Sequence, residues 1–197
     1  MDPLGKFLDY LTNKCIEIIN NAFLKHSPPT ISLNKVTDIN LEVLKKLKSE
    51  YGIGGLILDV DETLRKDFDD IPKCNKEWLE YMKKEFKVCI VSSGFDGKIQ
   101  EVLDQMNIKY DGFHLISKRK SFKNAAEEMG LEPENILVIG NDAIKDIYAG
   151  NKCGMITAIV KEVVEEKEEI ERWIPKIFPN KKSILNKNLK KMKKYID

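Results

Sequence analysis

Apolar residues in the first part of the chain recur at the spacing of a helix. Between residues 3 and 25 they fall at every third or fourth position, which places them on one helical face. Pro28 and Pro29 then predict where this helix ends. A second, shorter helix is predicted over residues 38–50, with Asp38 or Asn40 as its N-terminal cap.

From residue 55 onward, short apolar runs alternate with helical stretches. The runs predicted as strands are "GLILDV", "KVCIVS", the weaker "GFHLI", "NILVIG" and "GMITAIV". Each is apolar at successive positions, as in strands of a parallel sheet that is covered on both faces. The alternation predicts an α/β fold, a doubly wound (Rossmann-like) parallel sheet of about five strands. Sheets of this kind bind ligands at the carboxyl ends of their strands.

The pattern divides the chain into three parts. They are a helical extension, an α/β core and a charged helical tail, over residues 1–50, 51–160 and 161–197. Residues 161–171 of the tail hold six glutamates, whereas residues 181–197 hold seven lysines. The second stretch also has helical apolar spacing at Leu185, Leu189, Met192 and Ile196. It is therefore predicted as a short basic amphipathic helix, which either packs on the domain or is solvated, or else binds an anionic membrane, a partner or RNA.

The overall composition excludes a few classes of protein. Apolar residues make up 42% and charged residues 33%, with a net charge of +1, so no nucleic-acid partner is expected from the global charge. The longest apolar runs are far shorter than a membrane span, and a signal-peptide layout is absent. We expect a soluble, cytoplasmic protein, with peripheral contact to an anionic membrane through the basic tail as an alternative. No oligomeric state follows from these patterns.

Polar side chains follow the predicted strands at the ends that share one edge of the sheet. Aspartates follow the first strand, serines the second, and an amide and a carboxylate the fourth, at Asp59, Asp61, Ser92, Ser93, Asn141 and Asp142. Lys118 starts the helix after the weak third strand. Because the carboxyl ends of parallel strands meet at one edge, these groups are expected to converge.

The acidic residues at this edge suit a site for a phosphoryl group. Two carboxylates held close together repel, and a divalent cation relieves the repulsion; oxygen ligands without His or Cys favour magnesium. Asp59 could then act as a nucleophile and form an aspartyl-phosphate. Asp61 could protonate the leaving oxygen and later deprotonate water, provided that the chain turns away after Val60.

The other residues at the edge supply hydrogen-bond donors and positive charge. Ser92 and the backbone N–H groups of Ser93 and Gly94 would bind the phosphoryl oxygens, while Lys118 would balance their charge. Asp146, one helical turn beyond the fourth-strand carboxylate, would complete an acidic pair for the metal or its waters. With two histidines in the chain, a Ser-His-Asp hydrolase and a zinc site are both disfavoured.

Four segments resemble, in order and spacing, the motifs of haloacid-dehalogenase (HAD) superfamily phosphatases. They are "DVDETL", "VCIVSSG", "SKRKSFKNAAEEMG" and "ILVIGNDAIKDIYAGNKCG". The approach "KLKSEYGIGGLILDVDETL" and the exit "AGNKCG" are most similar to the YqeG-like subfamily, which includes mitochondrial phosphatidylglycerophosphate phosphatases. The resemblance spans residues 40–160 and implies a phosphatase with Asp59 as nucleophile and Asp61 as acid/base.

The resemblance also implies a magnesium ion. Its ligands would be Asp59, the main-chain carbonyl of Asp61 and an acid of the fourth motif. This chain departs from the family there, because Gly140 is followed by an asparagine where an aspartate is usual. The fourth-motif ligand could therefore be any of three residues, Asn141, Asp142 or Asp146.

The third motif departs from the family as well, since it lacks the usual Lys-Pro pair. The lysine that binds phosphate is either Lys118, which starts the helix in register, or Lys120.

No room is left for a cap domain over the site. Only 27 residues (65 to 91) separate Leu64 from Ser92, and 25 (93 to 117) separate Ser92 from Lys118. By resemblance, an open site goes with a lipid, macromolecular or partner-shielded phosphate. The alternative is a non-catalytic binding or regulatory module on the same scaffold, which Asn141 and the irregular third motif favour.

Overall fold

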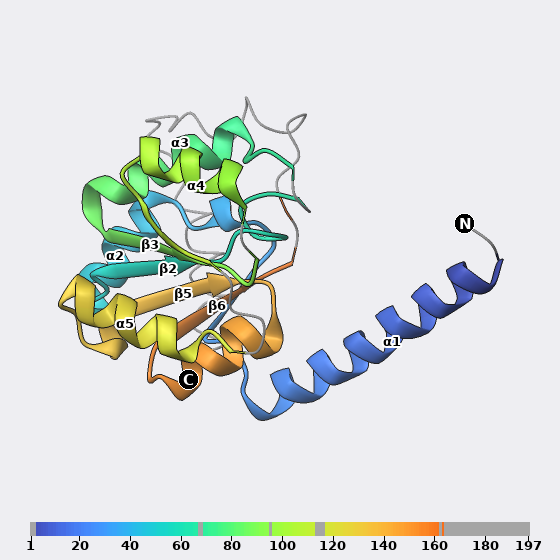
Figure 1. The fold of residues 1–197 in the computed structure, drawn as a ribbon. Helices are drawn as coiled ribbons and strands as arrows, with labels where there is room; N and C mark the ends of the chain where they lie inside the picture. The colour runs from blue at the N-terminus through green and yellow to red at the C-terminus, as the bar shows by residue number, and fades with distance from the viewer. Residues whose placement is uncertain (1–2, 67–68, 95, 113–116, 162, 164–197) are drawn as a thin grey trace, which may run out of the picture.

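A single parallel sheet forms the centre of the molecule (Figure 1). The computed structural model describes residues 3–66, 69–94, 96–112, 117–161 and 163. Its six strands are β1 (Ile31–Leu33), β2 (Gly55–Leu58), β3 (Lys87–Val91), β4 (Lys109–Asp111), β5 (Ile136–Gly140) and β6 (Ile156–Val160). They lie in the order β1-β6-β5-β2-β3-β4, and every pair is parallel. The predicted α/β class is confirmed, with six strands in place of about five.

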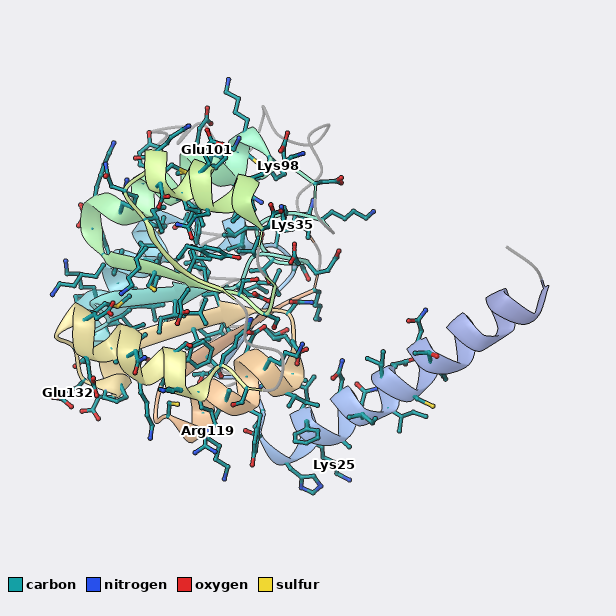
Figure 2. All side chains as sticks on the ribbon, in the orientation of Figure 1. Lys25, Lys35, Lys98, Glu101, Arg119 and Glu132 are labelled. Atoms are coloured by element: carbon teal, nitrogen blue, oxygen red, sulfur yellow. The ribbon has the colours of Figure 1, made fainter. Side chains whose placement is uncertain are left out.

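Helices cover both faces of this sheet. One face carries α2 (Leu41–Tyr51), α3 (Lys73–Glu85) and α4 (Gly97–Gln105), and the other carries α5 (Arg119–Met129), the π-helix η3 (Ala143–Tyr148) and α6 (Ala149–Lys152). Two short 3-10 helices lie in the connections, η1 (Val36–Asp38) and η2 (Pro133–Asn135). Charged side chains such as Glu101, Arg119 and Glu132 point outward (Figure 2). The apolar sides of the helices are thus left to cover the sheet.

Residues of the central strand β2 alternate between two cores. Leu56 and Leu58 lie in the core shared with α2 and α3, while Ile57 lies in the core shared with α5. All four residues of β2 are buried. Burial on both faces is the reason why the run is apolar at successive positions.

Two strands differ from the prediction. The three-residue strand β1 was not predicted; it pairs with β6, so a piece of the N-terminal extension belongs to the main sheet. Strand β4, at Lys109–Asp111, lies just before the third predicted strand, "GFHLI", of which residues 113–116 lie outside the described ones. The division of the chain into three parts remains a prediction.

Both predicted N-terminal helices are present. In α2 the side chain of Asn40 accepts a hydrogen bond from Val43 N at 2.8 Å, so Asn40 is the cap, as one of the two alternatives held. Helix α1 (Pro3–His26) ends just before the prolines and extends away from the domain (Figure 1).

Helix α1 touches the domain only near its C-terminal end within its described side chains. The ring of Phe23 packs edge-on against Tyr148 at 5.4 Å, whereas Ile16, Ile18 and Ile19 are 50%, 61% and 48% exposed. The apolar face therefore packs on the domain much less than its spacing suggests.

Within the described residues, α1 and the other helices are all too short or too polar to cross a membrane. The predicted basic helix of the tail lies outside the described residues.

The described residues between the motifs contain no cap domain. The described parts of the two connections hold only α3 with β3 and α4 with β4. The carboxyl edge of the sheet is thus left without a covering domain in the part of the chain that the structure describes.

Candidate active site

The aspartate pair lies on a tight turn directly after β2. The amide of Asp59 still belongs to the sheet, since it donates to Ile139 O at 2.9 Å. The chain then turns at Val60, whose carbonyl accepts from the amides of Thr63, Leu64 and Arg65. This is the turn that the aspartate spacing required, because Asp61 would otherwise follow the extended strand away from the edge.

Lys118 joins the first aspartate to the fourth motif. Its Nζ lies 2.8 Å from Asp59 Oδ1 and 2.7 Å from Asp146 Oδ1. The lysine side chain is fully buried, and those of Asp59 and Asp146 are 10% and 1% exposed. Lys120, the alternative lysine, is exposed on α5. Of the two candidates, Lys118 is therefore the one that the fold brings to Asp59.

Charge determines the state of this buried cluster. Burial by itself would lower the pKa of Lys118, but the carboxylates of Asp146 and Asp59 outweigh that effect and raise the pKa. Burial raises the pKa of Asp146, with Lys118 opposing the shift and Asp59 adding to it. The lysine thus stays charged, and one cation serves two carboxylates.

The turn after β5 brings Asp146 to the lysine. Asp146 Oδ2 accepts from Asp142 N at 3.0 Å, so both of its oxygens are hydrogen-bonded. The side chain of Asp142 caps η3 by accepting from the amides of Ile144 and Lys145, each at 2.8 Å. A Cβ at Gly140 would collide with the carboxylate of Asp146, so the close approach requires glycine.

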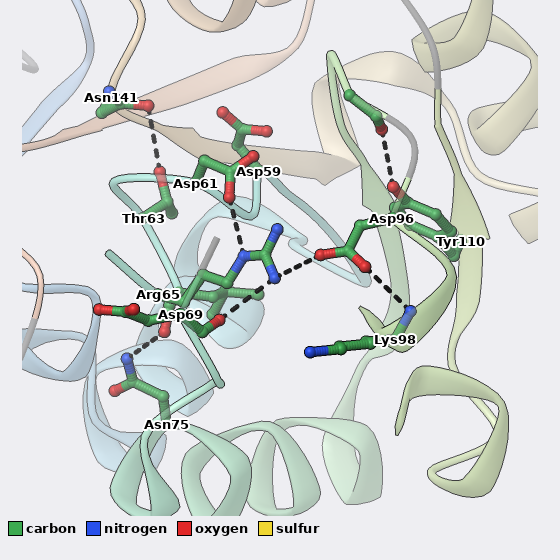
Figure 3. Close-up of polar contacts among 12 residues, drawn as sticks. Asp59, Asp61, Thr63, Arg65, Asp69, Asn75, Asp96, Lys98, Tyr110 and Asn141 are labelled. Carbon is green, nitrogen blue, oxygen red and sulfur yellow. Dashed lines mark hydrogen bonds and ion pairs between the residues drawn. The ribbon is translucent and has the colours of Figure 1, made fainter. Parts of the chain in front are cut away.

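Asn141 lies next to the aspartate turn. Leu58 of β2 pairs with Ile139 of β5, so the next residues along, Asp59 and Gly140, lie side by side. Asn141 follows directly after Gly140. The hydroxyl of Thr63 donates to Asn141 Oδ1 at 3.4 Å (Figure 3). The three fourth-motif candidates are thus separated by their partners: Asp142 is a cap, Asp146 holds Lys118, and Asn141 faces the turn of the first motif.

The second motif follows β3 at the same edge. Ser92 is 2% exposed, and its amide donates to Asp111 O at 2.9 Å. Ser93 and Gly94 are half-buried, and apart from its chain neighbours no atom of the described residues lies within 4 Å of where a Cβ of Gly94 would be. Tyr110 fixes this loop by donating from its hydroxyl to Gly94 O at 2.7 Å. Among the described residues, the space beside Gly94 is therefore unfilled, as binding of a phosphoryl group there would require.

The structure adds a buried cation that the sequence analysis missed. Arg65 is 3% exposed and lies between Asp61 and Asp96, with Nε 2.8 Å from Asp61 Oδ1 and Nη1 2.7 Å from Asp96 Oδ2 (Figure 3). An arginine directly after Leu64, the last residue of the first motif, was the one available signal. Asp96 could have been predicted as the N-terminal cap of α4, but its pairing with Arg65 could not.

The charges and ligands around the edge fit a divalent cation. Two cations, Lys118 and Arg65, stand against four carboxylates, which gives a net charge of −2 when all are ionised, over Asp59, Asp61, Asp96 and Asp146. No cluster of three or more His, Cys, Asp or Glu residues suited to a metal occurs in the described residues. That result is compatible with a site made of one carboxylate, a main-chain carbonyl and the amide oxygen of Asn141, which are oxygen donors of the kind magnesium prefers.

Fold and site together define a hydrolase of the HAD type. Comparisons with known proteins agree. A family model described as HAD-hydrolase-like matches residues 117–185. The probable phosphatase YqeG of Bacillus subtilis (strain 168) is 30% identical over 131 residues, which are 66% of this chain and 76% of the relative. The chain therefore belongs to the YqeG family of HAD-like phosphatases, as its motifs predicted.

Comparison with solved structures gives matches at lower identity, with TM-scores below 0.5. A structure assigned to subfamily III A of the HAD hydrolases, from Legionella pneumophila, is 18% identical with a TM-score of 0.47, covering 79% of this chain and 92% of the other. A HAD family enzyme from Bacteroides thetaiotaomicron, solved with magnesium and inorganic phosphate, is 12% identical with a TM-score of 0.47, covering 55% and 94%.

Proposed function

We propose that this protein is a Mg²⁺-dependent phosphomonoesterase that works through an aspartyl-phosphate on Asp59. The observation that supports this most directly is the buried ion pair of Lys118 with Asp59 and Asp146 at the carboxyl edge of the sheet. A lysine without solvent contact offers a fixed positive charge that needs no reorganisation when negative charge develops nearby. Membership of a phosphatase family argues against the non-catalytic alternative.

Two aspartates divide the chemistry. A carboxylate oxygen of Asp59 attacks phosphorus while the bond to the alcohol oxygen breaks, and Asp61 gives that oxygen a proton. In the second half, Asp61 takes a proton from a water molecule, whose oxygen attacks the same phosphorus. Inorganic phosphate leaves, and Asp59 is regenerated. Splitting one displacement into two replaces a single difficult step by two easier ones.

The phosphoryl oxygens are held from two sides. Ser92 and the backbone N–H groups of Ser93 and Gly94 donate from the loop after β3. Lys118 supplies positive charge from the start of α5. We assign no phosphate contact to Lys120, since its side chain is exposed on α5, whereas Lys118 is buried against Asp59.

Magnesium would be held by Asp59, the main-chain carbonyl of Asp61 and Asn141. Asp146 uses both carboxylate oxygens, on Lys118 and on Asp142 N, and Asp142 uses Oδ1 to cap η3, whereas Asn141 Oδ1 has one long bond, from Thr63 at 3.4 Å. When bound, the ion supplies the positive charge that lets an anionic carboxylate approach an anionic ester.

A substrate panel with and without magnesium tests this function. The purified protein should hydrolyse at least one class among sugar, nucleotide, lipid and protein phosphates in Mg²⁺. A metal contributes several kcal/mol to such a reaction, so EDTA should lower the rate roughly a hundredfold or more. Binding of Mg²⁺ by calorimetry without turnover of any member of the panel would instead support the non-catalytic module.

A membrane-borne lipid phosphate is the substrate class we propose. Two observations support it: the carboxyl edge has no cap domain in the described residues, and α1 exposes Ile16, Ile18 and Ile19. In Figure 1, α1 extends from the side of the domain toward which β2 and β5 point. A helix with its apolar face in the headgroup region would therefore turn the open site toward the lipid.

Sedimentation with vesicles tests the membrane contact. The full chain should bind vesicles rich in phosphatidylglycerol at low salt. Burying an isoleucine is worth about 1.5–3 kcal/mol, so Ile18→Asp should weaken binding roughly tenfold or more. Tyr81→Asp, at an exposed apolar residue on α3, is the matched control and should bind like the wild type. If the wild-type chain stays in the supernatant at low salt, the lipid proposal fails.

A further inference from the structure

Arg65 stands at the junction of two loops that the proposed mechanism uses separately. Its own backbone is fixed in the first-motif turn, because Arg65 N donates to Val60 O at 3.1 Å and Arg65 O accepts from Glu62 N at 2.7 Å. The neighbouring carbonyl of Leu64 accepts from Asn75 Nδ2 at 2.7 Å, a buried bond that ties the turn to α3. The guanidinium is thus presented from a rigid base.

The guanidinium divides its donors between two carboxylates. Nε bonds Asp61 Oδ1, and Nη1 bonds both Asp96 Oδ2 and Asp69 O, at 2.8, 2.7 and 3.2 Å (Figure 3). The planar fork can reach both acids without bending, which the single ammonium of a lysine cannot do. One rigid cation therefore sets the distance between Asp61 and Asp96.

Asp96 transfers this constraint to the second motif. Its Oδ1 accepts from Lys98 N at 2.9 Å and caps α4, while Oδ2 binds Arg65. The N-terminus of α4 directly follows the loop of Ser93 and Gly94. Hydrogen bonding to Arg65 lowers the pKa of Asp96, so the acid is a charged partner at neutral pH. The loop proposed to bind phosphate is thus linked to the turn that carries the proton donor.

We propose that Arg65 is the positioning residue for Asp61, and that through Asp96 it fixes this acid relative to the phosphate-binding loop. The inference rests on the proposed function, in which Asp61 exchanges protons with the leaving oxygen and with water. Among the described contacts Arg65 Nε bonds Oδ1 of Asp61, whose side chain is 28% exposed. One oxygen anchors the carboxylate, and the other transfers the proton.

Leaving-group dependence separates positioning from a general structural role. A nitrophenolate leaves without a proton, whereas an alkoxide needs one, so loss of a positioned acid affects the two esters differently. Arg65→Met should lower kcat/KM for an alkyl phosphate roughly 100-fold and that for p-nitrophenyl phosphate less than about fivefold. Arg65→Lys should recover only part of the loss. Equal losses on both esters, or no loss on either, would overturn the proposal.

The matched control is Lys98→Met, which removes an exposed cation from the same region. It should leave both values of kcat/KM within about twofold of the wild type. A loss like that of Arg65→Met would mean that activity depends on positive charge in this region, and not on the hydrogen bonds of the Arg65 guanidinium to Asp61 and Asp96.

Thermal unfolding tests the link independently of activity. The double variant, which carries both Arg65→Met and Asp96→Asn, is compared in EDTA with each of the two single variants. The combined fall in Tm should be clearly smaller than the sum of the single falls, because the second change finds its partner already removed. Additive falls would overturn the link even in an active enzyme. If the wild type hydrolyses neither ester, the proposed function fails, and the role of Arg65 in it fails too. Non-additive falls in Tm would still support the contact between Arg65 and Asp96.

Discussion

Replacing Asp59 by Asn should lower the turnover of p-nitrophenyl phosphate by ~10⁴-fold or more, because an amide cannot form the acyl phosphate. The amide oxygen can still accept from Lys118, so the fold should persist. The measurement is steady-state hydrolysis in Mg²⁺ together with a melting curve. Trapping of phosphate on the wild-type protein, by acid quench with a labelled substrate, should also vanish in the variant.

The matched control for this loss is Asp70→Asn. Asp70 is an exposed aspartate in the segment after the first motif, and its replacement should leave kcat/KM within about threefold of the wild type. Full turnover by purified Asp59→Asn would mean that another group attacks the ester. The assignment of the nucleophile would then be wrong, whatever the family of the chain.

Replacing Lys118 by Met should produce the largest loss of stability. The substitution leaves Asp59 and Asp146 without their shared cation, and removing one partner of a buried ion pair costs about 3–5 kcal/mol. Urea unfolding in EDTA measures the free energy of unfolding. Activity should also fall, by roughly 10²–10³-fold, since the phosphoryl group loses a fixed positive charge.

Two further variants make this result specific. Lys120→Met removes the exposed lysine two residues along the same helix, and its free energy of unfolding should stay within about 0.5 kcal/mol of the wild type. Adding Asp146→Asn to Lys118→Met should restore part of the stability, because the uncompensated buried carboxylate is gone. If Lys118→Met proves as stable as Lys120→Met, the buried cluster does not exist in solution.

The fold could be predicted where burial on both faces leaves a continuous apolar run. The runs at β2, β3, β5 and β6 have that property, and all four strands are present. The edge strands β1 and β4 have three residues each, too few for such a run. Their pairing depends on tertiary contacts with β6 and β3, which no local pattern contains.

The site could be predicted where residues follow strands directly. The strand ends fix Asp59, Ser92 and Asn141 to one edge, since parallel pairing aligns them. The two lysines of the third motif could not be distinguished, because their difference is burial: Lys118 points into the cluster, and Lys120 lies on the exposed side of α5. The apolar spacing predicts which face of a helix is buried, but it does not predict how deeply the first residues of the helix are buried.

The pairing of Arg65 with two carboxylates could not be predicted from the sequence, for a different reason. Its two carboxylate partners lie four residues before it and 31 residues after it, at Asp61 and Asp96. The nearer pair has the spacing of an ordinary surface ion pair on a helix. Only the turn after β2 and the approach of the α4 N-terminus convert that spacing into a buried bridge.

The central place of β2 has a consequence for how the molecule comes apart. Three strands separate it from one margin of the sheet and two from the other, and both margins end in three-residue strands. Such short outer strands fray most easily, and their opening breaks no hydrogen bond of β2. The backbone that carries Asp59, the proposed nucleophile, is therefore insulated from fraying of the outer strands. Opening of β4, however, would release Ser92 N and Gly94 O of the proposed phosphate-binding loop. Local opening at that margin should thus lower catalysis before the cooperative transition, while the strand before Asp59 is still intact.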